Sequence, residues 1–168
     1  MIKIKAIAII VVASSLNLFA QFRSAEIGVD GLTCSACSRT VEMSIRKLNF
    51  VQDVKMNPER AEGRIIFKSN VKVSIEDVAK AVANAGYSLR HLNAVFSFNK
   101  LAVKDDYCFS FEGNQYQFVK TGVKMLGGEM TLKFLGKEFL SRKEYKKWEL
   151  ELKPVCDKSK GAVFYVTL

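Results

Sequence analysis

The alternation of apolar and polar residues in the first half of the chain predicts short strands and two amphipathic helices. Residues 26–29 alternate with a period of two, as in a half-buried strand, and Gly31 ends that run. Val41, Ile45 and Leu48 then recur at helical spacing. The predicted strands are 26–29, 50–56, 63–68 and 87–95, and the predicted helices are 35–49 and 75–85.

These elements follow one another in the order βαββαβ. Such a split β-α-β unit buries one face of a four-stranded antiparallel sheet beneath two helices. We therefore predict an α+β, ferredoxin-like first domain over residues 21–92. A domain of about 70 residues is small but able to fold alone.

Residues 93–168 show a different pattern, in which strand-like segments predominate. Glu112-Gly113-Asn114 is a predicted hairpin turn. Ser141 begins a capping box and a helix to about Leu152, which Pro154 helps to end. The strand-like segments are 96–103, 107–111, 115–119, 130–135 and 163–168. We predict a smaller β-rich domain with one helix, and a shared interface because no low-complexity linker precedes it.

Two cysteines stand three residues apart in Thr33-Cys34-Ser35-Ala36-Cys37, where the first strand ends and the first helix begins. The unpaired N–H groups and the positive dipole of a helix's first turn stabilise thiolate over thiol. The same spacing also occurs in zinc ribbons, redox enzymes and haem-attachment sites. Ser38 replaces the His of c-type haem attachment, and the chain has no second Cys-x-x-Cys for a four-thiolate zinc site. We predict that Cys34 and Cys37 bind a metal, with a local disulfide or redox pair as the alternative.

The identity of the metal follows from the softness and number of these ligands. Two thiolates suit near-linear Cu(I) and also Hg(II), whereas zinc generally takes four ligands and calcium takes oxygen. Thr33 directly precedes Cys34, so that position offers no carboxylate for a harder ion. We therefore predict Cu(I) first, Hg(II) second and Zn(II) third. Delivery would proceed by exchange of one thiolate for another.

The residues around the cysteines resemble a known family. Gly31-Leu32-Thr33-Cys34-Ser35-Ala36-Cys37 is similar to Gly-Met-Thr-Cys-x-x-Cys of the heavy-metal-associated domain family, and Ala85-Gly86-Tyr87 to its later Ala-Gly-Tyr. The resemblance covers about residues 25–92, and the family includes bacterial copper chaperones and the periplasmic mercury-binding protein. It implies a ferredoxin-like fold, metal ligation by both cysteines, and a position for Tyr87 near the thiolates. Leu32 replaces the usual Met, as an apolar plug under the loop.

The first 20 residues have the three-part layout of a secretory signal. Lys3 and Lys5 precede an unbroken apolar run over residues 6–13, which is short for a bilayer span, and small residues follow. We expect cleavage after Ala20, with Ala25 as second choice, and an uncleaved anchor as the alternative. The remaining chain is then exported, to the periplasm or beyond, without a firm membrane span.

The charge of the chain narrows the choice of partner. The formal net charge is +9, and cleavage after Ala20 lowers it to +7 by removing Lys3 and Lys5. The basic residues are spread along the chain and do not form a dense stripe, and export also argues against nucleic acid. We expect as partner a metal-exchanging envelope protein of unknown identity.

Cys108 and Cys156 are separated by 48 positions. In an oxidising compartment they can form a structural disulfide, worth on the order of 3–4 kcal/mol in chain-entropy models. Free buried thiols and a second metal site remain as alternatives.

Other residues that could carry chemistry have ordinary structural explanations. His91 is the single histidine, at the end of a predicted strand, and Met125 and Met130 flank two glycines. Isolated methionines usually fill gaps in a core or loop, and a lone histidine is usually structural. The sequence offers no Ser/His/Asp arrangement and no phosphate-binding loop, so we predict no catalytic residues and no enzymatic activity. A thiol–disulfide redox protein is the alternative function.

Overall fold

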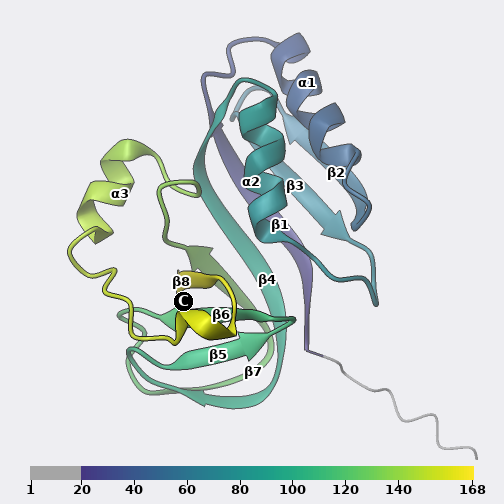
Figure 1. The fold of residues 1–168 in the computed structure, drawn as a ribbon. Helices are drawn as coiled ribbons and strands as arrows, with labels where there is room; N and C mark the ends of the chain where they lie inside the picture. The colour runs from purple at the N-terminus through teal and green to yellow at the C-terminus, as the bar shows by residue number, and fades with distance from the viewer. Residues whose placement is uncertain (1–19) are drawn as a thin grey trace, which may run out of the picture.

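The computed structural model describes residues 20–168 and contains, within them, eight strands and three α-helices (Figure 1). The predicted signal segment lies outside the described residues except for Ala20. The strands are β1 (Gln21–Asp30), β2 (Val51–Asn57), β3 (Glu62–Phe67), β4 (Ser88–Val103), β5 (Cys108–Phe111), β6 (Asn114–Phe118), β7 (Lys124–Phe134) and β8 (Val163–Thr167). The helices are α1 (Ser35–Arg46), α2 (Ile75–Asn84), α3 (Arg142–Trp148) and the short 3-10 helix η1 (Lys158–Lys160).

The first six elements confirm the predicted βαββαβ order. β1 lies between β3 and β4 and pairs antiparallel with both, while β2 pairs with the far edge of β3. Helices α1 and α2 lie side by side on one face of these strands (Figure 1). This half of the molecule has the ferredoxin-like arrangement.

Each of the two helices has a polar cap and an apolar stripe. In α2 the Ser74 hydroxyl accepts a hydrogen bond from the Asp77 N–H at 3.2 Å, and Val78 and Val82 are fully buried. In α1, Val41 and Ile45 are fully buried against the sheet. The first helix ends three residues earlier than its predicted end at 49, because residues 47–50 form turns instead.

Strand β1 is longer at its start than the predicted 26–29. It begins at Gln21, so the second-choice cleavage position after Ala25 falls inside the strand. Ala25 is paired with Ile65 and Ala94, and Phe22 is 2% exposed in the core. Cleavage after Ala25 would remove half of a central strand, whereas cleavage after Ala20 leaves β1 whole.

The two halves of the molecule share one sheet through β4. This 16-residue strand pairs with β1 along residues 88–97 and with β7 along residues 93–103. The expected domain boundary between residues 92 and 93 therefore falls within a strand, and the sheet crosses it without a break. The whole sheet has the order β2-β3-β1-β4-β7-β8-β6-β5 (Figure 1).

The C-terminal half contains mainly strands and one α-helix. β5 and β6 form a hairpin around Glu112 and Gly113, as predicted, and β6 pairs parallel with β8. β7 begins six residues before the predicted strand at 130, and α3 ends at Trp148, well before the predicted 152. In residues 20–168, no helix combines the length and apolar character that a membrane crossing requires.

An aromatic cluster joins the two halves. Phe96 of β4 is fully buried, with its ring centroid 4.9 Å from Phe22 of β1 and 4.9 Å from Phe111 of β5. The ring centroid of Phe98 lies 4.6 Å from that of Phe96. Further rings continue this cluster through the C-terminal half, namely Phe109, Tyr116, Phe118, Phe134, Phe139 and Phe164. The hydrophobic core is thus continuous across the predicted boundary.

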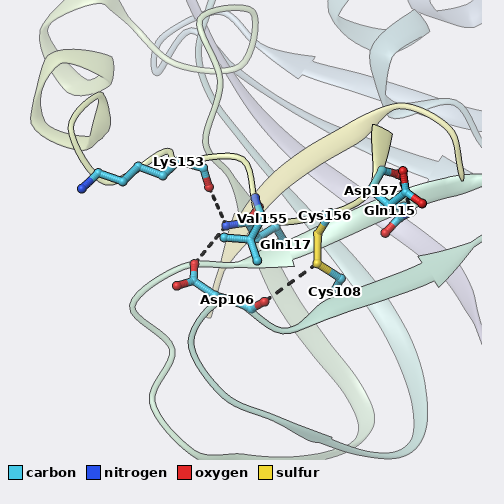
Figure 2. Close-up of a disulfide and its surroundings, with 8 residues drawn as sticks. All are labelled: Asp106, Cys108, Gln115, Gln117, Lys153, Val155, Cys156 and Asp157. Carbon is cyan, nitrogen blue, oxygen red and sulfur yellow. Dashed lines mark hydrogen bonds between the residues drawn. A yellow bond between two sulfur atoms is a disulfide. The ribbon is translucent and has the colours of Figure 1, made fainter. Parts of the chain in front are cut away.

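Cys108 and Cys156 form a disulfide, which resolves the alternatives left open by the sequence (Figure 2). Beside it, the fully buried Gln117 amide donates hydrogen bonds to the Asp106 carboxylate and to the Lys153 carbonyl, both at 2.9 Å. The Val155 N–H donates to the Gln117 carbonyl oxygen at 3.0 Å. The disulfide and this side chain together attach the segment after α3 to β5 and β6.

Candidate metal centre

The loop between β1 and α1 carries both predicted ligands. β1 ends at Asp30, and Gly31 follows with φ +86°, a left-handed conformation that favours glycine. A Cβ at Gly31 would lie 3.6 Å from the ring of Tyr87. The ring therefore packs over the start of the loop that carries the two cysteines. Leu32 is partly buried and packs against the core, as expected for an apolar plug.

Cys34 and Cys37 lie at the start of α1. Cys34 is the N-cap residue, and its sulfur accepts a hydrogen bond from the Cys37 N–H at 3.2 Å. The first turn of α1 contains no acidic residue whose negative charge would repel a thiolate there. Cys34 is exposed and Cys37 is half-buried. The sulfur of Cys34 thus has a backbone donor and belongs to an exposed residue.

The structure holds the two cysteines as a disulfide, with their Cα atoms 5.3 Å apart. Metal binding requires the reduced pair, which forms when the disulfide takes up two electrons and two protons from a donor thiol or other reductant. Loss of the protons then yields two thiolates one helical turn apart. The helix N-terminus favours that loss.

The donor set around the loop fits a soft ion of low coordination number. In the described residues, no group of three or more His, Cys, Asp or Glu side chains is placed to hold a metal ion. Two sulfurs without further such ligands suit Cu(I) or Hg(II), whereas Zn(II) generally requires four ligands. The exposed Cys34 leaves space for a third sulfur from another molecule.

The other sequence candidates do not join this loop. His91 pairs with Gly28 in the sheet, and its Nε2 lies 3.7 Å from the Glu26 carboxylate. Met125 and Met130 lie on β7, opposite Ala102 and Phe96, and within residues 20–168 the strands paired with β7 are β4 and β8. None of the three contributes to the cysteine pair.

Sequence reasoning missed a groove between α1 and α2, beside the first turn of α1. It measures about 420 Å³, and its lining includes Arg39, Met43 and Lys47 of α1 with Asn84 of α2. Met43 is 44% exposed. The three α1 residues are spaced four apart and therefore share one helix face. This spacing could have indicated the groove from the sequence.

Comparisons with known proteins agree with this geometry. The family described as heavy-metal-associated domain matches residues 26–88. The mercuric transport protein periplasmic component of Shigella flexneri is 32% identical over 75 residues, covering 45% of this chain and 81% of that protein. The copper chaperone CopZ of Staphylococcus haemolyticus is 30% identical over 64 residues, covering 38% of this chain and 93% of that protein. The chain belongs to the heavy-metal-associated domain family.

Two further matches show how far the likeness extends. Copper-transporting ATPase 1 of Rhizobium meliloti is 35% identical over 69 residues, but the match covers only 8% of that protein and 41% of this chain. The solved structure of oxidized MerP from Ralstonia metallidurans CH34 is 34% identical, with a TM-score of 0.35, and the match covers 43% of this chain and 99% of that chain. The family match ends at residue 88, so all of residues 93–168 lie outside it.

Proposed function

We propose that this protein captures Cu(I) through Cys34 and Cys37 in an exported compartment and delivers it to a metal-exchanging envelope protein. The observation that carries the proposal is the pair of sulfurs at the accessible N-terminus of α1, without a third ligand group in the described residues. Relatives named for copper and for mercury transport support a soft metal as cargo. Export is supported by the signal-like first 20 residues and by the periplasmic relative.

Delivery follows from the open side of the site. A thiolate of the partner attacks the two-coordinate ion and gives a three-coordinate intermediate, and one of the original thiolates then leaves. No electron is transferred, and the ion keeps its charge. The backbone N–H of Cys37 donates to the sulfur of Cys34 and keeps that sulfur in position while the bond between the ion and the leaving thiolate breaks. This cycle contains no catalytic step, and we assign no enzymatic activity to the chain.

We place Cu(I) first and keep Hg(II) as the second candidate for the same two thiolates. Both ions accept two thiolates in a near-linear arrangement. Competition between the two ions for the reduced protein, with equal chelator buffering, gives the preference directly. If the protein preferred Hg(II), its proposed function would be mercury trafficking through the same two cysteines.

The decisive experiment measures metal retention by the reduced protein. We expect one Cu(I) per chain in native mass spectrometry, and loss of that ion when Cys34→Ser and Cys37→Ser are combined. A matched control replaces the thioethers by Met125→Leu with Met130→Leu, and we expect it to retain the ion. Equal retention by the double cysteine variant would refute the proposal.

A thiol–disulfide redox function is the second candidate, because the structure holds Cys34 and Cys37 as a disulfide and Cys34 is exposed. A redox protein turns over many substrate disulfides per molecule, whereas a carrier binds its cargo stoichiometrically. Substrate turnover at catalytic protein concentrations, lost in the Cys34→Ser variant, would favour the redox function.

We propose for residues 93–168 a role in docking or anchoring.

A further inference from the structure

The end of the ribbon formed by β4 and β7 presents apolar side chains to solvent. We define this ribbon end as residues 99–104 and 122–128. Ala102 pairs with Met125, and both are exposed, with Met125 at 70%. Val123, just before β7, is 89% exposed. Leu126 points to the opposite face and is fully buried, so the core does not need Met125 or Val123.

The ribbon end is also basic. Lys100, Lys104 and Lys124 are exposed, and these two segments contain no acidic residue. Among the ion pairs and hydrogen bonds of residues 20–168, none involves these three ammonium groups. Three cationic groups thus lie within the ribbon end, on both faces of the strands, and lack an internal counterion.

Three acidic residues border the ribbon end, and each already has a partner. The Asp105 carboxylate accepts hydrogen bonds from the Thr121 and Gly122 N–H groups at 2.6 and 2.8 Å. Asp106 accepts from Gln117, and Glu129 lies 4.0 Å from Arg23. None of these carboxylates is paired with Lys100, Lys104 or Lys124 in the described residues.

The ribbon end lies where the chain enters the fold and away from the metal-binding loop. Gln21, the first residue of β1, pairs with Ser97, and β4 continues from there into the ribbon end. The metal-binding loop follows the other end of β1. Ten residues of strand separate the two ends, which corresponds to about 30 Å.

We propose that the ribbon end docks on an anionic lipid bilayer surface. Val123 and Met125 insert at the boundary between headgroups and acyl chains, and the three lysines bind lipid phosphates. A second copy of the chain is a poorer occupant, because its lysines would face those of the first copy. Docking in this orientation keeps Cys34 and Cys37 on the far side, open to a metal-exchanging partner. The inference goes beyond the proposed function and does not depend on which metal is bound.

The test is sedimentation with lipid vesicles, with the chain that begins at Gln21 so that the apolar run cannot bind in its place. We expect binding to vesicles of phosphatidylglycerol and phosphatidylcholine in equal parts, and little binding to phosphatidylcholine alone. Combining Lys100→Gln, Lys104→Gln and Lys124→Gln should weaken binding by at least about tenfold. The matched control, Lys47→Gln with Lys143→Gln and Lys158→Gln, removes equal charge elsewhere and should bind nearly as the parent chain does.

The apolar contribution is tested separately. Val123→Ser with Met125→Ser should weaken binding at least about tenfold, and the conservative pair Val123→Ile with Met125→Leu should retain it. Circular dichroism verifies that each variant is folded. Equal binding to both vesicle types, equal loss in the two lysine triples, or a serine pair that binds normally would overturn the proposal. It would also be overturned if the serine pair abolished a dimer of the parent chain in sedimentation equilibrium.

Discussion

The two halves of this molecule each contain one cysteine pair, and the pairs differ in every respect that matters for function. Cys34 and Cys37 are separated by three positions and lie on an accessible loop at a helix start. Cys108 and Cys156 are separated by 48 positions, and Cys156 is only 7% exposed. A crosslink over a long segment removes much conformational freedom from the unfolded chain, whereas one over three residues removes little. The first pair is therefore suited to exchange, and the second to stabilisation.

The two cysteine pairs also differ in the number of hydrogen bonds formed around them. Next to the Cys108–Cys156 disulfide, the side-chain amide of the fully buried Gln117 makes three hydrogen bonds (Figure 2). Around the first pair, the sulfur of Cys34 receives a single backbone hydrogen bond. Satisfied buried polar groups hold a segment in one arrangement. A lightly held and accessible sulfur can change partners.

Among the substitutions that test whether the two halves behave differently, Phe96→Ala should cause the largest loss of stability. Removal of a fully buried ring that contacts both β1 and β5 should cost about 3–5 kcal/mol. Since the ring lies in the shared core, we expect both halves to lose stability together. Hydrogen exchange of α1 amides and Trp148 fluorescence, followed in denaturant, report on the two halves.

Phe50→Ala is the matched control for that experiment, because Phe50 packs beside Phe67 within the first half. We expect it to affect the α1 amides first. If Phe96→Ala destabilised the C-terminal half alone, residues 21–92 would be an independent domain, as the sequence predicts.

The next effect in size is removal of the long-range disulfide. Cys108→Ser with Cys156→Ser should lower the free energy of unfolding by about 3–4 kcal/mol, because the unfolded chain regains the freedom of the 48-residue segment. Metal retention by the reduced protein should not change. Denaturant unfolding monitored by Trp148 fluorescence gives the first quantity, and native mass spectrometry the second.

The double variant Cys34→Ser with Cys37→Ser provides the converse control. It should lose the metal while its unfolding free energy changes less than that of the other pair. An equal loss of stability in both variants would show that the two disulfides are not functionally different.

The smallest effect concerns α3, which packs on the C-terminal half. Hydrogen bonds from Lys147 and Lys133 lower the pKa of Glu144 to about 2. Because the folded pKa lies below the ordinary value of 4.5, these pairs stabilise the fold above about pH 5 and cease to do so as the pH falls toward about 2. The carboxylate is partly exposed, so solvent limits the effect to about 1 kcal/mol or less.

The measurement compares the unfolding free energy of the parent chain with that of Glu144→Gln across this pH range. The difference should decrease on acidification and also with added salt. A difference that is independent of pH would contradict the assignment of Glu144 as an ionised partner of the two lysines.

Local patterns were enough to predict the elements of the first half. The period of two in β1, the cap at Ser74 and the glycine at 86 each depend on a few neighbouring residues. The position of Tyr87 near the loop came from the family resemblance and agrees with its packing against Gly31. The sequence predicted two separate segments, 87–95 and 96–103, where the structure has the single strand β4. The division falls in the region where the pairing partner of β4 changes from β1 to β7.

The sequence by itself determined the order βαββαβ and the paired cysteines at a strand-to-helix junction, because both follow from periodicities and spacings of a few residues. Tertiary structure alone decided that Cys108 joins Cys156, that Phe22 meets Phe111, and that exposed lysines and apolar side chains share a ribbon end far from the loop that carries Cys34 and Cys37. These relations join residues distant along the chain. Their proximity depends on how β4 continues one sheet through both halves, which no local pattern encodes.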